Sequence, residues 1–179
     1  FLLPVVTDGD RCYKETQSKV FNLVQFLEVT IGSMNVKLDS GEYAYTSEMR
    51  AALRDKQIAF LHLMFENGDF GFFDTHLHYI HKNQAMYYAK VGDNEKAIEH
   101  LRHAAEHAIR FIKHMCKETH TSLLFRNMPA GSFATTGTNN DAAELLNSMR
   151  QPVFDNIRDT EAFKSIRDEL SAYAGKWDV

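Results

Sequence analysis

Proline is scarce in this chain of 179 residues, which contains only three, at Pro4, Pro129 and Pro152. None of them interrupts a long segment of helical periodicity. Proline removes a backbone donor and clashes with the preceding helical turn. Because proline is scarce, most of the chain can form long helices.

Cysteine is also scarce, because the chain has only Cys12 and Cys116, far apart and outside any CxxC pattern. Two such cysteines exclude a disulfide framework and a zinc knuckle. We interpret them as free thiols in a reducing cytoplasm, which is the expected location.

Long hydrophobic runs and an excess of positive charge are both missing. The apolar run FLLPVV at the start is too short to span a membrane and follows no basic segment. The net charge is −4, with lysines and arginines scattered among carboxylates. A protein that binds DNA usually gathers its cations in a basic patch. We expect neither membrane association nor direct DNA binding by these residues. The chain begins at Phe1, so we also expect it to be a fragment or a processed chain.

The sequence has no sustained alternation of apolar and polar residues and no hairpin turn between β-branched runs. We therefore predict no β-sheet. The sequence also lacks GxSxG, Walker and HExxH motifs. We therefore expect an all-α protein that is not an enzyme and needs no cofactor.

Apolar residues recur every three or four positions along most of the chain, which is the helical period. This spacing predicts helices over about 10–33, 46–67, 70–91, 94–114 and 140–149, with a last one from Thr160. The segment 118–139, rich in Gly, Thr and Asn, is predicted to be a long irregular connection. Such connections often serve in binding, and the alternative is a merely mobile loop.

One segment, HYIHKNQAMYYAKVGDNEKAIEHLRHAAEHA, resembles a tetratricopeptide repeat, in which small residues let two helices touch closely. The resemblance depends on the residues expected to pack where the two helices and their turn meet, which are Ala85, Tyr88, Gly92, Ala97, Leu101 and Ala104. One unit cannot bury its faces alone, so neighbouring helices are required. The predicted fold is a single all-α domain, residues 1–179, of antiparallel helical hairpins in a tetratricopeptide-like α-α superhelix.

A longer resemblance covers roughly residues 46–170. The segments LMFENGDFGFFDTHLHYIHKNQ, HTSLLFR, NNDAAELLNSM and FDNIRDTEAFKSI occur in one order. This order resembles the C-terminal regions of bacterial XRE-type (lambda-repressor-like) helix-turn-helix transcriptional regulators. The resemblance implies an effector-sensing or oligomerisation region, in a homodimer, whose DNA contact is made only by an N-terminal helix-turn-helix that is absent from these residues.

Tetratricopeptide-like arrays usually offer the inner face of their first helices as a binding groove. On that basis we predict a groove for a peptide, a small ligand or a partner protein at His81, Asn83, Gln84 and Tyr87.

The chain has nine histidines. His100, His103 and His107 follow the helical period, and imidazoles so spaced can share a metal ion. They are predicted to lie about 90° around the helix from the alanine stripe, on a half-buried flank. A solvated or partner-facing flank is the favoured interpretation, and a metal site is the weaker alternative.

Three functions remain open from the sequence. The chain is the sensing half of a transcriptional regulator, or a free-standing tetratricopeptide-like scaffold for a protein partner, or, more weakly, a metal-sensing domain. The last helix is predicted either to meet a partner chain or to cap its own chain, through Phe163, Ile166, Leu170, Tyr173 and Trp177.

Overall fold

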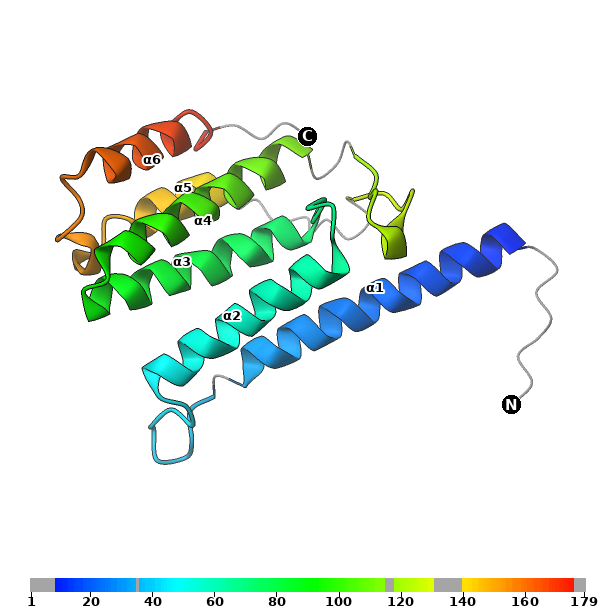
Figure 1. The fold of residues 1–179 in the computed structure, drawn as a ribbon, viewed down its shortest axis with the longest axis horizontal. Coiled ribbons are helices and arrows are strands. Elements are labelled where there is room, and N and C mark those ends of the chain that lie inside the picture. Colours follow the sequence, from blue (N-terminus) through cyan, green and yellow to red (C-terminus); the bar gives the residue numbers. More distant parts are fainter. Residues whose placement is uncertain (1–8, 35, 115–117, 131–139, 176–179) are drawn as a thin grey trace.

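The computed structural model describes residues 9–34, 36–114, 118–130 and 140–175 (Figure 1). These residues form six α-helices, two short 3-10 helices and no strand, with two isolated β-bridges. The all-α class is therefore confirmed. The elements are α1 (Gly9–Ser33), α2 (Ser47–Met64), α3 (Phe73–Val91), α4 (Asn94–His114), η1 (Leu123–Phe125), α5 (Asp141–Ser148), η2 (Pro152–Phe154) and α6 (Glu161–Ser171). The apolar run FLLPVV, Cys116 and the stretch 131–139 lie outside the described residues.

Side-chain caps fix where three of the helices begin. The hydroxyl oxygens of Thr46 and Thr160 accept hydrogen bonds from backbone N–H groups three residues later, and the Asn140 side chain does the same. Each cap satisfies an N–H group that has no partner inside the helix. These starts agree with the predicted ones to within a residue.

Helix α2 ends earlier than predicted. The sequence predicts an end near Asn67-Gly68, but the last helical residue is Met64. Phe65 leaves the helix to become fully buried, and its ring stacks on that of Phe125 at 4.8 Å. Gly68 takes the left-handed conformation only afterwards, in the turn toward α3. Burial of an aromatic ring has therefore overridden the local stop signal.

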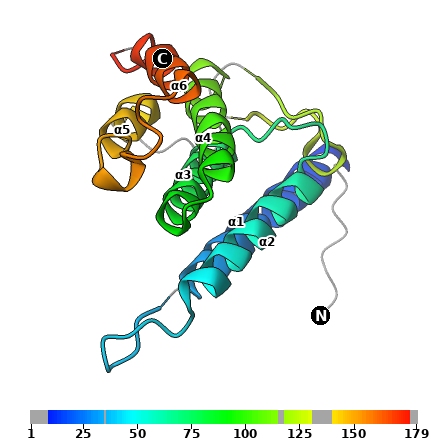
Figure 2. The ribbon, with the colours of Figure 1, turned by 60° about the vertical axis from the view of Figure 1, so that its left-hand side comes forward.

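Consecutive helices pack on one another, and the core falls into two clusters (Figures 1 and 2). Helices α1 and α2 lie side by side, and α5 and α6 lie on the far side of the α3–α4 pair from them. One cluster joins α1, α2, the first half of α3 and η1, and the other joins α3, α4, α5, η2 and α6. No helix in the described part of the chain has the length and apolar character to cross a membrane.

The hairpin of α3 and α4 has the close packing that its small residues predict. Ala85, Ala97, Leu101 and Ala104 are all fully buried in one cluster, with Tyr88 packed at its edge. Gly92 ends α3 in the left-handed conformation at φ +83°. Glycine adopts this conformation without the steric cost that a Cβ imposes.

Replacement of Ala97 by Leu is expected to destabilise the protein by about 1–3 kcal/mol, because the added atoms overpack a fully buried helix contact. Urea unfolding measures the change. Ala52→Leu, at an exposed position of α2, is the matched control and should change stability by less than about 0.5 kcal/mol. If Ala97→Leu unfolds like the parent, the close approach of α3 and α4 is wrong.

The stripe of the last helix is covered within its own chain. Phe163, Ile166 and Leu170 are buried in the cluster that α6 shares with α4 and α5. Of the two predicted roles, the structure therefore favours the one in which the last helix covers the end of its own chain. These three side chains offer no apolar surface to a partner, whereas Tyr173 is half-buried and Trp177 lies outside the described residues.

The first part of the predicted connection is packed rather than free. Residues 118–130 form η1 and one β-bridge, and Phe125 and Met128 are buried against α1 and α2. The Asp69 carboxylate accepts hydrogen bonds from the backbone N–H groups of Thr121 and Ser122 and from the Ser122 hydroxyl. Burial opposes its ionisation, but these bonds outweigh burial and lower the pKa of Asp69.

Candidate functional site

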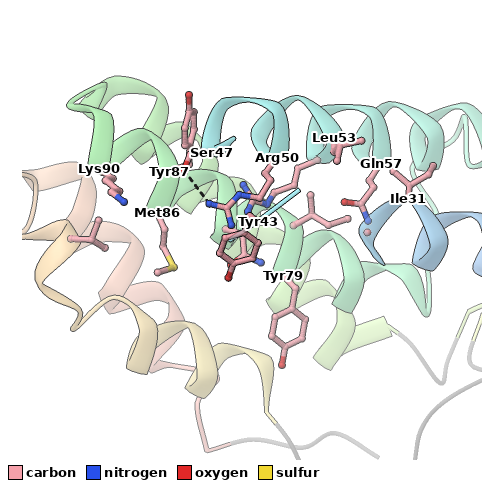
Figure 3. Close-up of a pocket in the computed structure, with 15 residues that line it drawn as sticks. Ile31, Tyr43, Ser47, Arg50, Leu53, Gln57, Tyr79, Met86, Tyr87 and Lys90 are labelled. Atoms are coloured by element: carbon pink, nitrogen blue, oxygen red, sulfur yellow. Dashed lines mark hydrogen bonds between the residues drawn. The ribbon is translucent and has the colours of Figure 1, made fainter. Parts of the chain in front are cut away.

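A groove of about 570 Å³ runs between α2 and α3 (Figure 3). Its size is in the range of small-molecule sites. We call it the arginine groove, and it is lined by Ile31, Gly32, Tyr43, Ser47, Arg50, Leu53, Arg54, Gln57, Tyr79, Ile80, Asn83, Met86, Tyr87, Lys90 and Val153.

The charges of the arginine groove are all of one sign. Arg50, Arg54 and Lys90 line it, and none of the described residues that line it is Asp or Glu. The chain as a whole carries a net charge of −4. A local excess of cations in an acidic protein attracts anions.

Arg50 is held at the middle of the groove (Figure 3). Its guanidinium lies 4.0 Å over the Tyr43 ring, and its Nη2 donates to the Ser47 hydroxyl at 3.0 Å. Its Nε is shielded from water and has no hydrogen-bond partner among the described residues. Buried donors without a partner are rare in folded proteins, so this N–H group is a place where an acceptor would be stabilised.

Arg54 lies one helical turn after Arg50 on α2. Its Nη1 donates to the Gln84 side-chain oxygen at 3.3 Å. Burial lowers the pKa of Arg54, and the neighbouring charge of Arg50 lowers it further, whereas the Asp55 carboxylate opposes both. Two like charges at this spacing repel one another, which is a cost that a bound anion would offset.

The walls of the groove are aromatic and aliphatic. Tyr79 and Tyr43 remain 36% and 45% exposed, and Met86 and Tyr87 are half-buried beside them. The described lining holds no His, Asp or Glu that could take a proton from a nucleophile. These walls offer stacking and apolar contact to a bound group.

The structure separates the four residues predicted to share a groove. Asn83 and Tyr87 line the arginine groove. Gln84 is fully buried in the contact of α2 with α3, where its Nε2 donates to the Ala51 carbonyl oxygen at 3.0 Å. His81 lines a different groove. Residues two apart on a helix lie about 200° around its axis, so His81 and Asn83 face opposite sides of α3.

That second groove, of about 750 Å³, lies between α2 and α4. We call it the histidine groove, and its lining is Asp55, Ile58, Ala59, His62, Gly68, Phe70, His81, Glu99, His100, His103, Glu106, His107 and Arg110. His81 Nδ1 lies 2.9 Å from His100 Nδ1, and the His81 ring stacks on that of His107. The predicted histidine flank therefore faces a groove and is joined by His81 and His62.

Burial keeps several of these imidazoles neutral. Burial is the main cause that lowers the pKa of His81, to about 2, and the surrounding histidines add to it. Burial also lowers the pKa of His62 and of His100. Neutral imidazoles accept and donate hydrogen bonds but attract anions weakly, so this groove differs from the arginine groove in kind.

His107 is less solvated than predicted, because it is buried against Asp74, with its Nδ1 2.7 Å from Asp74 Oδ1. His103 Nδ1 pairs with Glu106 Oε2 at 3.1 Å at the surface. Among the described residues, no three His, Cys, Asp or Glu side chains are arranged to hold a metal ion. The weak candidates His100, His103 and His107 thus share a groove without forming a ligand set.

Sequence reasoning missed Arg50, Arg54 and Tyr43. One signal was available in RAALR, where the two arginines are four residues apart and share a helix face. No carboxylate stands three or four residues from Arg50 to pair with it. Tyr43 gave no such signal, because it reaches the groove from the connection before α2.

Comparison of the chain with models of protein families, with curated proteins and with solved structures gives no match. The resemblance to helix-turn-helix regulators therefore stays a prediction from the order of sequence segments.

Proposed function

We propose that the chain is the effector-sensing and oligomerisation domain of a bacterial transcriptional regulator, and that the arginine groove takes the effector. The observation that carries the proposal is a groove of ligand size that gathers three cations in a chain of net charge −4. The order of segments that resembles XRE-type regulators supports the regulatory role. A cytoplasmic location follows from that role.

Filling the groove is expected to abolish ligand binding. Asn83 is exposed on α3 within the groove, so Asn83→Trp adds a large ring there without disturbing the core. A fragment library screened by ligand-observed NMR should give hits on the parent that are lost on this variant. Arg102→Trp, at an exposed position outside both grooves, is the control and should keep them. Hits that survive Asn83→Trp would place ligand binding elsewhere.

DNA contact belongs, on this proposal, to a helix-turn-helix outside these residues. The 179-residue chain is not expected to bind duplex DNA at physiological salt, because it is acidic overall.

A free-standing tetratricopeptide-like scaffold is the second candidate, and an apolar flank on α1 favours partner docking. Leu23, Phe26 and Leu27 are each at least 40% exposed on α1, and residues 20–34 contain a single charged residue, Glu28, which is buried. Two acidic copies of the chain can meet on this charge-free flank without repulsion, so a second copy is the occupant that we propose.

The dimer is tested by sedimentation equilibrium. The parent is expected to sediment as a dimer and Phe26→Glu as a monomer, because each copy would then place a carboxylate in an apolar contact. Arg102→Glu, a charge change at an exposed position of α4 outside both grooves, is the control. A parent that stays monomeric at high concentration would remove the dimer.

A further inference from the structure

The ligand chemistry of the arginine groove follows from its two guanidinium groups. Arg50 and Arg54 stand one turn apart on the same face of α2 and both line the groove, whereas Asp55, whose charge partly offsets that of Arg54, lies outside its lining. An acidic group seated between them would accept from both. Guanidinium groups bind carboxylates, sulfonates and phosphates through strong charge-assisted hydrogen bonds.

Arg50 is a fixed cation in the wall of the groove. The Arg50 guanidinium is fixed by Tyr43 and Ser47, so its position does not depend on a ligand. Its shielded Nε nevertheless lacks a hydrogen-bond partner among the described atoms. Because this atom is shielded, an acceptor in the groove reaches it only if the Arg50 side chain shifts, so the charge of the guanidinium rather than this donor carries the attraction.

The remaining walls select the body of the ligand. The half-exposed rings of Tyr43 and Tyr79 and the side chains of Met86 and Ile80 offer flat and apolar contact surface. Such surface stabilises aromatic or aliphatic groups by removing them from water. Three cations are too few for a nucleic-acid backbone, whose binding requires many phosphate contacts.

We propose that the ligand of the arginine groove is a small organic anion, with one acidic group held between Arg50 and Arg54 and an apolar or aromatic body against the tyrosines. This inference rests on the proposed function, in which the groove is the effector site. It goes further by excluding neutral apolar ligands as the preferred class.

Two dyes of matched shape test the charge preference. Anilinonaphthalene sulfonate and N-phenylnaphthylamine share an aromatic body, and only the first carries an anionic group. Fluorescence titration of the full chain should give a dissociation constant at least about tenfold lower for the sulfonate. Equal affinities, or tighter binding of the neutral dye, would overturn the anion preference.

Substitution of the groove cations tests whether they cause the preference for the anionic dye. Arg54→Gln and Lys90→Gln should each weaken the sulfonate, the first by about tenfold or more, and leave the neutral dye unchanged. Lys90 is exposed, so its variant keeps the fold even if loss of the half-buried Arg54 does not. Arg102→Gln, exposed and outside both grooves, is the matched control and should bind both dyes like the parent.

The outcomes separate this inference from the proposed function. If Asn83→Trp removes both dyes but the arginine variants change nothing, the groove binds ligands and the anion inference is wrong. If Asn83→Trp leaves the binding of both dyes unchanged, the groove is not the site, and the proposed function loses its basis together with the inference.

Discussion

The protein is expected to lose stability when the pH falls from 7 to 5, and His81 is the main identified cause. Burial holds the pKa of His81 near 2 in the folded state, whereas an unfolded histidine has its ordinary value near 6.5. Below pH 6.5 the unfolded chain therefore binds a proton that the folded chain refuses. The stabilisation is fully present above pH 6.5 and declines as the pH falls toward 2. Between pH 6.5 and 5 the loss from His81 is about 2 kcal/mol.

Urea unfolding at pH 7 and at pH 5 measures this loss. His62, His100 and His120 also have pKa values lowered by burial, so they act in the same direction. The difference between the parent and His81→Gln isolates His81, because glutamine does not titrate. The variant should lose about 2 kcal/mol less than the parent over this range. Equal losses in the two proteins would show that His81 is not held neutral by burial.

Replacement of Gly71 by Ala is expected to destabilise the protein by about 3 kcal/mol or more. Gly71 has φ +56°, where an L residue costs about 1–2 kcal/mol. A Cβ there would also lie 2.9 Å from the Ala130 carbonyl oxygen and from His120 Cε1. Relief of these contacts requires movement of backbone in the packed segment 118–130, and such overpacking costs a further 1–3 kcal/mol or so.

Gly92→Ala is the matched control for Gly71→Ala. Gly92 has φ +83°, and a Cβ there would meet nothing within 4 Å. It should therefore cost only the backbone penalty of about 1–2 kcal/mol. The two free energies of unfolding, compared by urea titration, isolate the contact with segment 118–130. If both variants cost the same, that segment does not pack on Gly71.

The helices could be predicted from the sequence because local signals set them. Caps at Thr46, Asn140 and Thr160 and the left-handed Gly92 act within a few residues of themselves, and the apolar period reports the face that each helix buries. The close contact at Ala97 was predictable for the same reason, since a small residue on a buried stripe requires a close neighbour.

The packing of segment 118–130 could not be predicted, because it depends on contacts between residues far apart in the sequence. Ser122 reaches Asp69, and Phe125 stacks on Phe65. A composition rich in small polar residues gives no sign of either partner. The ring contact also explains why α2 ends at Met64.

The candidate site was predictable only in part. Asn83 and Tyr87, four residues apart, share a helix face and line the arginine groove together. His81 and Gln84 do not join them, because they lie on other sides of α3, where Gln84 is buried against α2 and His81 lines the histidine groove. The opposite wall of the groove, with Arg50, Arg54 and Tyr43, could not be predicted, because it depends on how α2 and the connection before it pack against α3.

Amide chemical-shift mapping by NMR tests the central claim, that the groove between α2 and α3 is the binding site of this protein. The isotopically labelled 179-residue chain would be titrated with anilinonaphthalene sulfonate. The largest shifts are expected at residues 47–57 of α2 and 79–90 of α3, which line the arginine groove. Largest shifts at residues 99–110 of α4, along the histidine groove, or along α1, would contradict the claim.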